Sequence, residues 1–301
     1  MKVQKEALKG GELELSEIIY GTWRIWDRGT PKLEQLFEVF DYCVEFGVSS
    51  FDLADIYGDY RCELSFGQVL KERKSIRDKV QLISKAGIQL VSANNPGTYI
   101  KHYDTRPEHL EKSVSSSLNK LQTDYLDLFL IHRPDPFINY PDCAKALNQM
   151  IRNQQVRAIG VSNFSPEQVN ALQYWLDVPI LVNQVEISPL CLKAFDDGTL
   201  DHCQVNQLKP LAWSPFAGGQ IFDLGESLPL NQTMKRLAEK KGLGLDQLVI
   251  AWLKSHPAKI TPILGTSNVK RIESIVQSCD ARLEIQEWFE IYSASKGEEV
   301  P

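Results

Sequence analysis

The sequence predicts an α/β protein, a (β/α)8 TIM barrel with an N-terminal β-hairpin and extra helices before and after the last β/α unit. Three observations support this prediction: short apolar runs alternate with helical patterns, eight such runs can be counted, and polar side chains follow them. The 301 residues, 43% of them hydrophobic, lie within the usual size of one such barrel. A single domain over residues 1–301 is therefore expected.

The elements can be placed in chain order from apolar runs and helical spacing. Gly10-Gly11 and the residues after it indicate a hairpin that could close the bottom of the barrel. Thr30-Pro31 and Ser165-Pro166 are typical of helix starts. The expected strands are 18–21, 49–53, 80–84, 125–134, 156–161, 180–182, 209–212 and 261–264. The expected extra helices are 231–240, 246–255 and 285–295, and a long loop is expected at 87–105.

A doubly wound sheet is the alternative α/β fold. Such a sheet usually carries a glycine-rich phosphate-binding turn after its first strand, and Gly21-Thr22-Trp23-Arg24 does not have that pattern. The barrel is therefore the preferred interpretation.

Composition narrows the class of protein. The net charge of −6 comes from 39 acidic and 33 basic residues without a basic block, so no nucleic-acid or membrane partner is expected. The six cysteines form no C-x-x-C pair, which indicates reduced thiols rather than a disulfide framework. The amino terminus is polar and no apolar run is long enough to cross a bilayer. A cytoplasmic protein, monomeric or weakly homo-oligomeric, is expected.

Polar side chains follow most of the expected strands. A single residue of this kind often caps a helix or bonds to loop backbone. Together they indicate one functional mouth, because parallel barrel strands end on the same face. The residues are Asp52, Lys85, His132, Ser162, Asn163, Gln184, and Ser214 next to Trp213.

Three of these residues, Asp52, Lys85 and His132, suggest acid catalysis together with Tyr57. A free phenol, with a pKa of roughly 10, is too weak an acid at neutral pH, and a nearby ammonium such as Lys85 would favour the phenolate. Burial would tend to neutralise Lys85, and the Asp52 carboxylate could keep it charged. His132 could then donate a hydrogen bond to a substrate oxygen.

The segment Gly47-x-x-x-Phe51-Asp52-Leu53-Ala54-Asp55-Ile56-Tyr57-Gly58 resembles the signature of the aldo-keto reductases. The resemblance covers nearly the whole chain, and His132-Arg133-Pro134-Asp135-Pro136 and the carboxyl-terminal end resemble a bacterial oxidoreductase branch of this family. Other segments in the family's order are Leu82-Ile83-Ser84-Lys85, 127–134, Gly160-Val161-Ser162-Asn163-Phe164, Asn183-Gln184-Val185-Glu186 and Trp213-Ser214-Pro215. The resemblance implies that Tyr57 donates the proton, that Lys85 and Asp52 tune it, and that His132 orients a carbonyl.

The resemblance also implies a nicotinamide cofactor and a small-molecule carbonyl substrate. Nicotinamide contacts are implied for Thr22, Trp23, Asp52, Ser162, Asn163, Gln184 and Trp213, and pyrophosphate contacts for Ser214, Pro215, Phe216, Ala217, Gly218 and Gly219. Gly265, Thr266, Ser267 and Arg271 match the 2′-phosphate segment, and a guanidinium there favours NADP(H) over NAD(H). Gly265 replaces a common lysine, and Ser274 and Ile275 replace frequent adenine contacts. The resemblance therefore supports use of NADPH more strongly than tight binding of it.

The leading interpretation is an NADPH-dependent carbonyl reductase. A nicotinamide-binding regulatory or sensor protein on the same fold is a rival, although it would not need an activated phenol. A Schiff base on Lys85 would leave the cofactor motifs unexplained. A metallohydrolase would need clustered ligands, and the five histidines contain no His-x-His pair, so no metal is expected.

Overall fold

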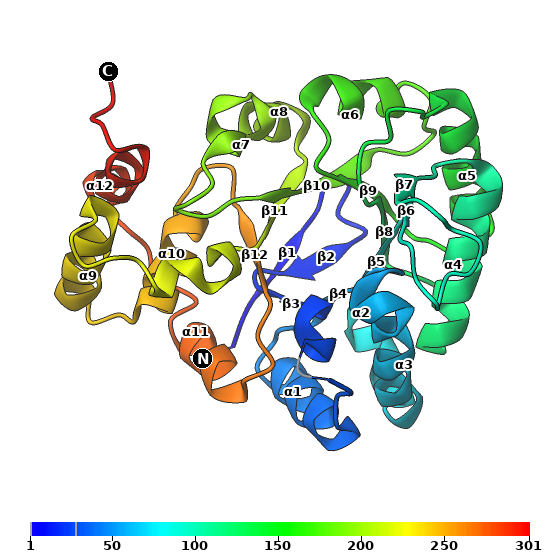
Figure 1. Ribbon diagram of the computed structural model, residues 1–301, viewed down its shortest axis with the longest axis horizontal. Helices are drawn as coiled ribbons and strands as arrows, with labels where there is room; N and C mark the ends of the chain where they lie inside the picture. Colours follow the sequence, from blue (N-terminus) through cyan, green and yellow to red (C-terminus); the bar gives the residue numbers. More distant parts are fainter. Residues whose placement is uncertain (1, 28) are drawn as a thin grey trace.

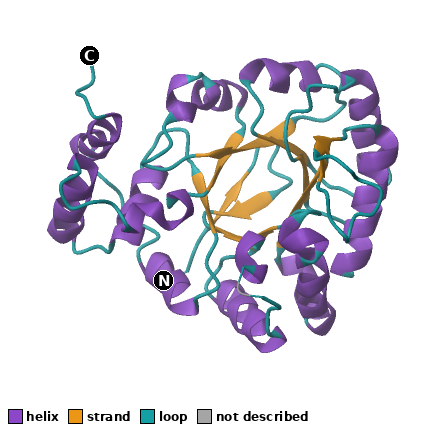
Figure 2. Cartoon of the chain, viewed as in Figure 1, coloured by secondary structure: helices purple, strands orange, loops and turns teal. Residues whose placement is uncertain are grey.

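The computed structural model describes residues 2–27 and 29–301 and has a closed barrel of eight parallel strands at its centre (Figures 1 and 2). The predicted TIM barrel is confirmed. In barrel order the strands are β3 (Ile19–Gly21), β4 (Ser50–Asp52), β5 (Gln81–Ala86), β8 (Leu128–Ile131), β9 (Ile159–Ser162), β10 (Ile180–Glu186), β11 (Lys209–Trp213) and β12 (Thr261–Leu264). Because all eight run in one direction, their carboxyl ends share one mouth.

Helices cover the outside of the barrel, as Figure 2 shows in purple. The α-helices are α1 (Leu33–Glu45), α2 (Tyr57–Tyr60), α3 (Cys62–Glu72), α4 (Pro107–Leu121), α5 (Tyr140–Arg152), α6 (Pro166–Gln173), α7 (Lys193–Asp196), α8 (Thr199–Asn206), α9 (Pro229–Lys241), α10 (Leu245–Lys254), α11 (Val269–Gln277) and α12 (Ile285–Lys296). The 3-10 helices are η1 (Trp23–Trp26), η2 (Lys74–Lys79) and η3 (Ala217–Phe222). The expected extra helices correspond to α9, α10 and α12.

The two predicted helix starts have different outcomes. Ser165 caps α6 as expected, because its side chain accepts from the Gln168 backbone and the Gln168 side chain accepts from the Ser165 backbone. The start at Thr30-Pro31 is wrong. Helix α1 begins at Leu33, and Lys32, which is extended with φ −75° and ψ 132°, is its N-cap residue. The extended backbone at Lys32 keeps Pro31 outside the helix.

The N-terminal hairpin consists of β1 (Lys5–Ala7) and β2 (Glu14–Ser16), which pair antiparallel. Leu8, Leu13 and Leu15 are buried in one apolar cluster with side chains from the barrel interior. The hairpin therefore closes the bottom of the barrel, as the sequence suggested. Burial of three leucines there contributes roughly 1.5–3 kcal/mol each to folding.

The expected long loop at 87–105 contains a small sheet that the sequence did not reveal. Strands β6 (Ile88–Gln89) and β7 (His102–Tyr103) pair antiparallel through two residues each. The segment between them is held to α2 because the Leu90 backbone donates to the Tyr60 hydroxyl at 2.8 Å. Strands of two residues are too short to give an alternating hydrophobic pattern.

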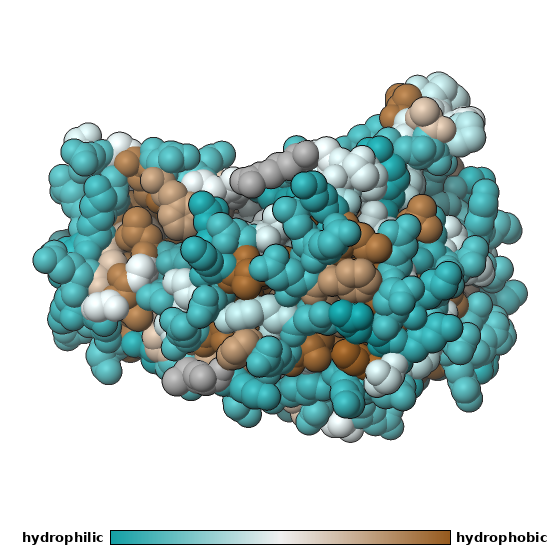
Figure 3. Space-filling model, turned by 90° about the horizontal axis from the view of Figure 1, so that it is seen from below, coloured by the Kyte–Doolittle hydropathy of each residue, from teal (hydrophilic) through white to brown (hydrophobic). Residues whose placement is uncertain are grey.

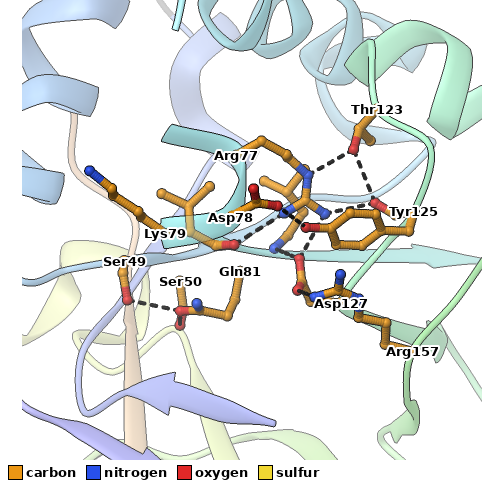
Figure 4. Close-up of polar contacts among 12 residues, drawn as sticks. Ser49, Ser50, Arg77, Asp78, Lys79, Gln81, Thr123, Tyr125, Asp127 and Arg157 are labelled. Atoms are coloured by element: carbon orange, nitrogen blue, oxygen red, sulfur yellow. Dashed lines mark hydrogen bonds and ion pairs between the residues drawn. The ribbon is translucent and has the colours of Figure 1, made fainter. Parts of the chain in front are cut away.

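A polar cluster surrounds Asp127 at the amino-terminal end of β8 (Figure 4). Arg77 pairs with the Asp127 carboxylate at 2.8 Å, and the Leu82 backbone donates to the same carboxylate at 2.9 Å. The guanidinium carbons of Arg77 and Arg157 lie 3.8 and 3.6 Å from the Tyr125 ring centroid. These contacts join η2, β5, β8 and β9 at the end of the barrel opposite the mouth.

Helices α9 and α12 lie side by side outside the ring of helices (Figure 1). Helix α12 is joined to α10 by two indoles, since Trp252 and Trp288 each donate to the other's backbone carbonyl at 3.2 and 3.1 Å. Their rings stack with centroids 5.3 Å apart. This aromatic contact fixes the carboxyl-terminal helix on the barrel.

Among the described residues, no helix combines the length and the apolarity that crossing a membrane requires. The face in Figure 3 is mainly hydrophilic, with hydrophobic residues in small groups between hydrophilic ones. Isolated exposed apolar residues of this kind are ordinary for a folded protein.

Candidate active site

The predicted site residues gather around one cavity of about 320 Å³ at the carboxyl ends of the strands. Of the predicted positions, those that line it are Trp23, Asp52, Tyr57, His132, Ser162, Asn163, Gln184, Trp213, Ser214, Pro215, Phe216, Gly218, Gly219, Gly265, Thr266 and Arg271. Side chains from β4, β8, β9, β10, β11 and β12 thus meet at the mouth that the parallel strands share.

Asp52, Tyr57 and Lys85 form one buried hydrogen-bonded group. The Lys85 ammonium donates to the Asp52 carboxylate, the Leu53 carbonyl and the Tyr57 hydroxyl, each at 2.8 Å. All three ammonium donors therefore have partners, and the side chain is fully buried. Asp52 accepts a second bond, at 2.8 Å, from the Gln184 amide. The predicted arrangement of these three side chains is present.

The turn that positions Tyr57 requires glycine at the next residue. Gly58 has φ +57°, and an added Cβ would lie 2.6 Å from the Trp26 ring and 2.7 Å from the Cys62 sulfur. A larger residue would push the turn, and the phenol with it, away from Lys85. Trp23 covers the outer side of the phenol, with ring centroids 5.1 Å apart.

The charge states of this group follow mainly from burial. Burial, and then the Asp52 carboxylate, raise the pKa of the Tyr57 phenol well above its ordinary value. Burial lowers the pKa of Lys85, while Asp52 acts in the opposite direction. Burial thus opposes the effect expected of Lys85, which was to favour the phenolate. The phenol is therefore protonated at neutral pH.

His132 lies at the end of β8 beside the phenol. Its ring centroid is 5.7 Å from that of Tyr57, the rings meet edge to face, and Nδ1 is buried without a hydrogen-bond partner among the described residues. Burial, followed by the Lys85 and Arg133 charges, lowers the pKa of His132 well below its ordinary value. The imidazole is therefore neutral and carries one N–H donor.

An ordered amide network lies on the other side of the mouth. The Ser162 hydroxyl donates to the Gln184 carbonyl at 2.9 Å and accepts from the Asn163 amide at 2.8 Å. The Trp213 indole donates to the Asn163 amide oxygen at 3.0 Å. Asn163 and Ser214 have φ +62° and +53°, uncommon values that turn the chain sharply where β9 and β11 end. These bonds hold the Trp213 ring over the cavity.

The loop after β11 is built for close backbone approach. Gly218 and Gly219 have φ +71° and +104°, and an added Cβ at Gly219 would meet nothing within 4 Å. The Gly218 backbone donates to the Ser214 hydroxyl at 2.9 Å, which closes the loop. The Gly219 backbone donates to the Phe216 carbonyl at 2.8 Å, so both glycine N–H groups are engaged within the loop, and what the loop offers a ligand is open space beside its backbone.

The loop after β12 and the first turn of α11 bring Gly265, Thr266 and the exposed Arg271 to the far side of the cavity. Ser274 and Ile275 stand where the resemblance would place adenine contacts, and both of these side chains are engaged by other parts of the protein. Ser274 accepts from the Gln247 side chain at 3.1 Å, and Ile275 is buried in the core. The chain itself thus engages both positions.

Four predicted positions do not line the cavity. Lys85 lies behind Tyr57, and Ala217 and Ser267 belong to the flanking loops. Thr22 is fully buried, and its hydroxyl donates to the Asp52 carbonyl at 3.0 Å, so it joins the ends of β3 and β4 rather than facing the cavity. Buried strand-end hydroxyls commonly bond to backbone in this way.

Sequence reasoning missed five residues that line the cavity. They are Gly21, Arg24, Arg133, Phe222 and Ile263. Arg133 follows His132 directly in a quoted motif, so an available signal for it was a charge at the end of a strand. The side-chain directions of Arg24 and Phe222 depend on loop conformation, which local sequence does not determine.

Comparison with known proteins places this barrel among the oxidoreductases. The chain matches the Aldo/keto reductase family over residues 17–296, and it belongs to that family. Members of the family reduce carbonyl groups and generally bind nicotinamide cofactors. Among the described residues, no group of three or more His, Cys, Asp or Glu side chains could hold a metal ion.

Several relatives match almost end to end. A 6-dehydroglucose reductase of Agrobacterium fabrum is 38% identical over 96% of this chain and 97% of its own. The oxidoreductase YdhF of Escherichia coli is 37% identical over 96% of both chains. The crystal structure of a thermostable aldo-keto reductase, Tm1743, in complex with the inhibitor epalrestat, superposes with a TM-score of 0.83 at 26% identity, covering 97% of this chain and 99% of that one.

Proposed function

We propose that this protein, as a single barrel domain over residues 1–301, reduces aldehydes or ketones to alcohols with NADPH. The observation that carries the proposal is the Tyr57 hydroxyl, 2.8 Å from the buried Lys85 ammonium, at the edge of a cavity that His132 also lines. A protonated phenol beside a fixed cation can release its proton to a developing alkoxide, because the cation stabilises the phenolate that remains.

The residues divide the proton chemistry among them. The neutral His132 imidazole donates its N–H to the carbonyl oxygen and orients it toward Tyr57. Tyr57 protonates that oxygen as negative charge develops on it. Lys85 then holds the phenolate, and Asp52 keeps Lys85 charged through their 2.8 Å contact. A reduced nicotinamide cofactor, held by the residues that line the mouth, would supply the hydride for the carbonyl carbon.

The cavity also suits the nucleotide. Ser162, Asn163 and Gln184 offer amide and hydroxyl groups at one end, beside the Trp213 ring. The open glycine backbone at 218–219 suits a pyrophosphate, and Arg271 suits a 2′-phosphate, which supports NADPH over NADH. Gly265 stands in place of a common lysine, so this end of the cavity has one cation fewer. We therefore expect NADPH to bind with moderate affinity.

The direct test follows NADPH oxidation at 340 nm with a panel of carbonyl compounds. The panel contains nitrobenzaldehydes, dicarbonyls and, because of the 6-dehydroglucose reductase relative, sugar aldehydes. Turnover of at least one carbonyl, absent with Tyr57→Phe, is expected. No turnover across the panel, while fluorescence titration shows bound NADPH, would reject the enzyme and favour a sensor.

Cofactor choice has its own test. Arg271→Met should raise the KM for NADPH roughly tenfold to hundredfold and leave the KM for NADH nearly unchanged, because only NADPH carries the 2′-phosphate. Equal changes for both nucleotides would contradict the assignment of Arg271. Mass spectrometry of a nucleotide that co-purifies with the protein would identify the cofactor independently.

A further inference from the structure

Three arginines line the cavity, and two of them have an identified partner or role. Arg24 donates to the Gly218 carbonyl at 3.2 Å and lies 3.9 Å from the Asp27 carboxylate. Arg271 stands in the first turn of α11, where we place the 2′-phosphate. The third arginine, Arg133, has neither an identified partner nor an identified role. It follows His132 and lies at the end of β8, beside the reacting groups.

Arg133 makes no hydrogen bond or ion pair with any residue in the described parts of the chain. Its guanidinium carbon lies 5.5 Å from the Trp213 ring centroid, which orients the group without using its five N–H donors. The side chain is half-buried. A guanidinium that has lost part of its solvent normally gains a carboxylate or phosphate partner.

The surroundings of Arg133 leave that partner to a ligand. Asp52 is the only carboxylate among the lining residues, and Lys85 and Gln184 already occupy both of its oxygens. Glu186 lies opposite Trp213 in the β10–β11 register and forms no ion pair with Arg133; burial raises the pKa of Glu186, and the Arg133 charge opposes that rise only in part. The cavity near the phenol therefore has one uncommitted cation.

We propose that Arg133 binds a carboxylate of the substrate, so that the site accepts oxo acids, compounds with a carbonyl and a carboxylate in one molecule. This inference rests on the proposed carbonyl reduction and names its substrate class. The planar guanidinium fork matches a carboxylate with two parallel hydrogen bonds. His132 holds the carbonyl oxygen, and the adjacent Arg133 holds the charged end. Glu186 weakens the site for an anion.

The test uses two aldehydes of the same shape, 4-carboxybenzaldehyde and 4-nitrobenzaldehyde, and the ratio of their kcat/KM values. Arg133 also influences the Tyr57 phenol, and the ratio cancels any effect common to both substrates. Arg133→Gln should lower the carboxylate-to-nitro ratio roughly tenfold to hundredfold. Arg133→Lys should lower it less, and Glu186→Gln should raise it. Arg24→Gln removes a cation from the same cavity and serves as the matched control.

A ratio within twofold of wild type for Arg133→Gln, with 4-nitrobenzaldehyde still reduced by the wild type, overturns the inference and leaves the proposed function standing. A ratio that falls as far with Arg24→Gln also overturns it, because the effect would then belong to net charge. Quenching of tryptophan fluorescence by the two aldehydes gives the same comparison without turnover. If the wild type reduces neither these two aldehydes nor any other carbonyl of the panel, the proposed function fails, and the comparison of binding still decides the role of Arg133.

Discussion

The two ends of the barrel each hold a buried carboxylate paired with a cation at 2.8 Å, and the surroundings of the two pairs differ. At the amino-terminal end, Asp127 and Arg77 are enclosed by further donors and acceptors, including the Leu82 backbone (Figure 4). At the carboxyl end, Asp52 and Lys85 lie behind a phenol that opens on a cavity. The same type of ion pair is therefore enclosed within the fold at one end, and at the other it lies beside the phenol to which we assign the proton transfer.

The two ends of the barrel differ in which polar groups lack a hydrogen-bond partner. Arg77 donates to Thr123, Tyr125 and Val80 as well as to Asp127. At the mouth, one nitrogen of His132 is buried without a partner among the described residues, and the residue itself lines an open cavity. Unpaired polar groups cost stability, and they persist where function needs them. We therefore expect mutations at the two ends to separate activity from stability.

The largest effect is expected for Tyr57→Phe, matched by Tyr125→Phe at the opposite end. Loss of the proton donor should lower kcat by roughly 10²–10⁴-fold without weakening NADPH binding. Tyr125 is far from the cavity, so its variant should keep wild-type kcat. Steady-state kinetics and a fluorescence titration with NADPH measure both. A Tyr57→Phe enzyme with normal turnover would assign the proton to another group.

His132→Ala should cost turnover far more than NADPH affinity. In the proposed mechanism the imidazole orients only the carbonyl, and we expect a loss of roughly 10²-fold in kcat/KM, as for removal of one hydrogen-bond donor at a developing oxyanion. Kinetics and NADPH titration on the same preparation make the comparison. Equal losses of turnover and affinity would show that His132 contributes to the nucleotide site instead.

Asp127→Ala should change stability rather than chemistry. Removing one partner of a buried ion pair leaves Arg77 uncompensated, and the free energy of unfolding should fall by about 3 kcal/mol. Asp78→Ala removes an exposed carboxylate of the same cluster, which accepts from the Tyr125 hydroxyl at 3.1 Å, and should cost less than about 1 kcal/mol. Urea unfolding gives both values, and kcat per folded molecule should match wild type in each. A lower kcat with Asp127→Ala would contradict the assignment of the amino-terminal ion pair to stability alone.

The smallest effect concerns pH. Burial, Lys85 and Arg133 lower the pKa of folded His132 below its unfolded value, so the unfolded chain takes up a proton first on acidification. This contribution to stability is full above pH ~6.5 and is lost as the pH falls toward the folded pKa. Between pH 7 and 5, wild type should lose up to about 1.4 kcal/mol per pH unit more than His132→Gln. The other histidines titrate in both proteins. If wild type and His132→Gln lose stability equally as the pH falls, His132 takes up its proton in the folded protein as readily as in the unfolded chain.

The barrel and most of its mouth could be predicted from the sequence because their signals are local. Apolar runs gave all eight strands to within a few residues, and the polar residues after them lie around one cavity. The strand boundaries were predicted less accurately. The strand expected from Val156 begins at Ile159, because Val156 makes only an isolated bridge with Leu126. The sequence alone does not show where the register between two strands shifts, because that register is set only when the strands pair.

The sequence by itself determined the order of the strands, the hairpin at the bottom and the residue types that reach the mouth, because hydrophobic periodicity and strand ends are properties of short segments. Only the tertiary structure decided which groups are desolvated and which are left without partners. It holds the Tyr57 phenol protonated despite the nearby Lys85, buries Thr22 away from the cavity, and turns Arg133 toward it. Desolvation and unpaired charge are sums over neighbours distant in sequence, and those neighbours are fixed only when the barrel closes.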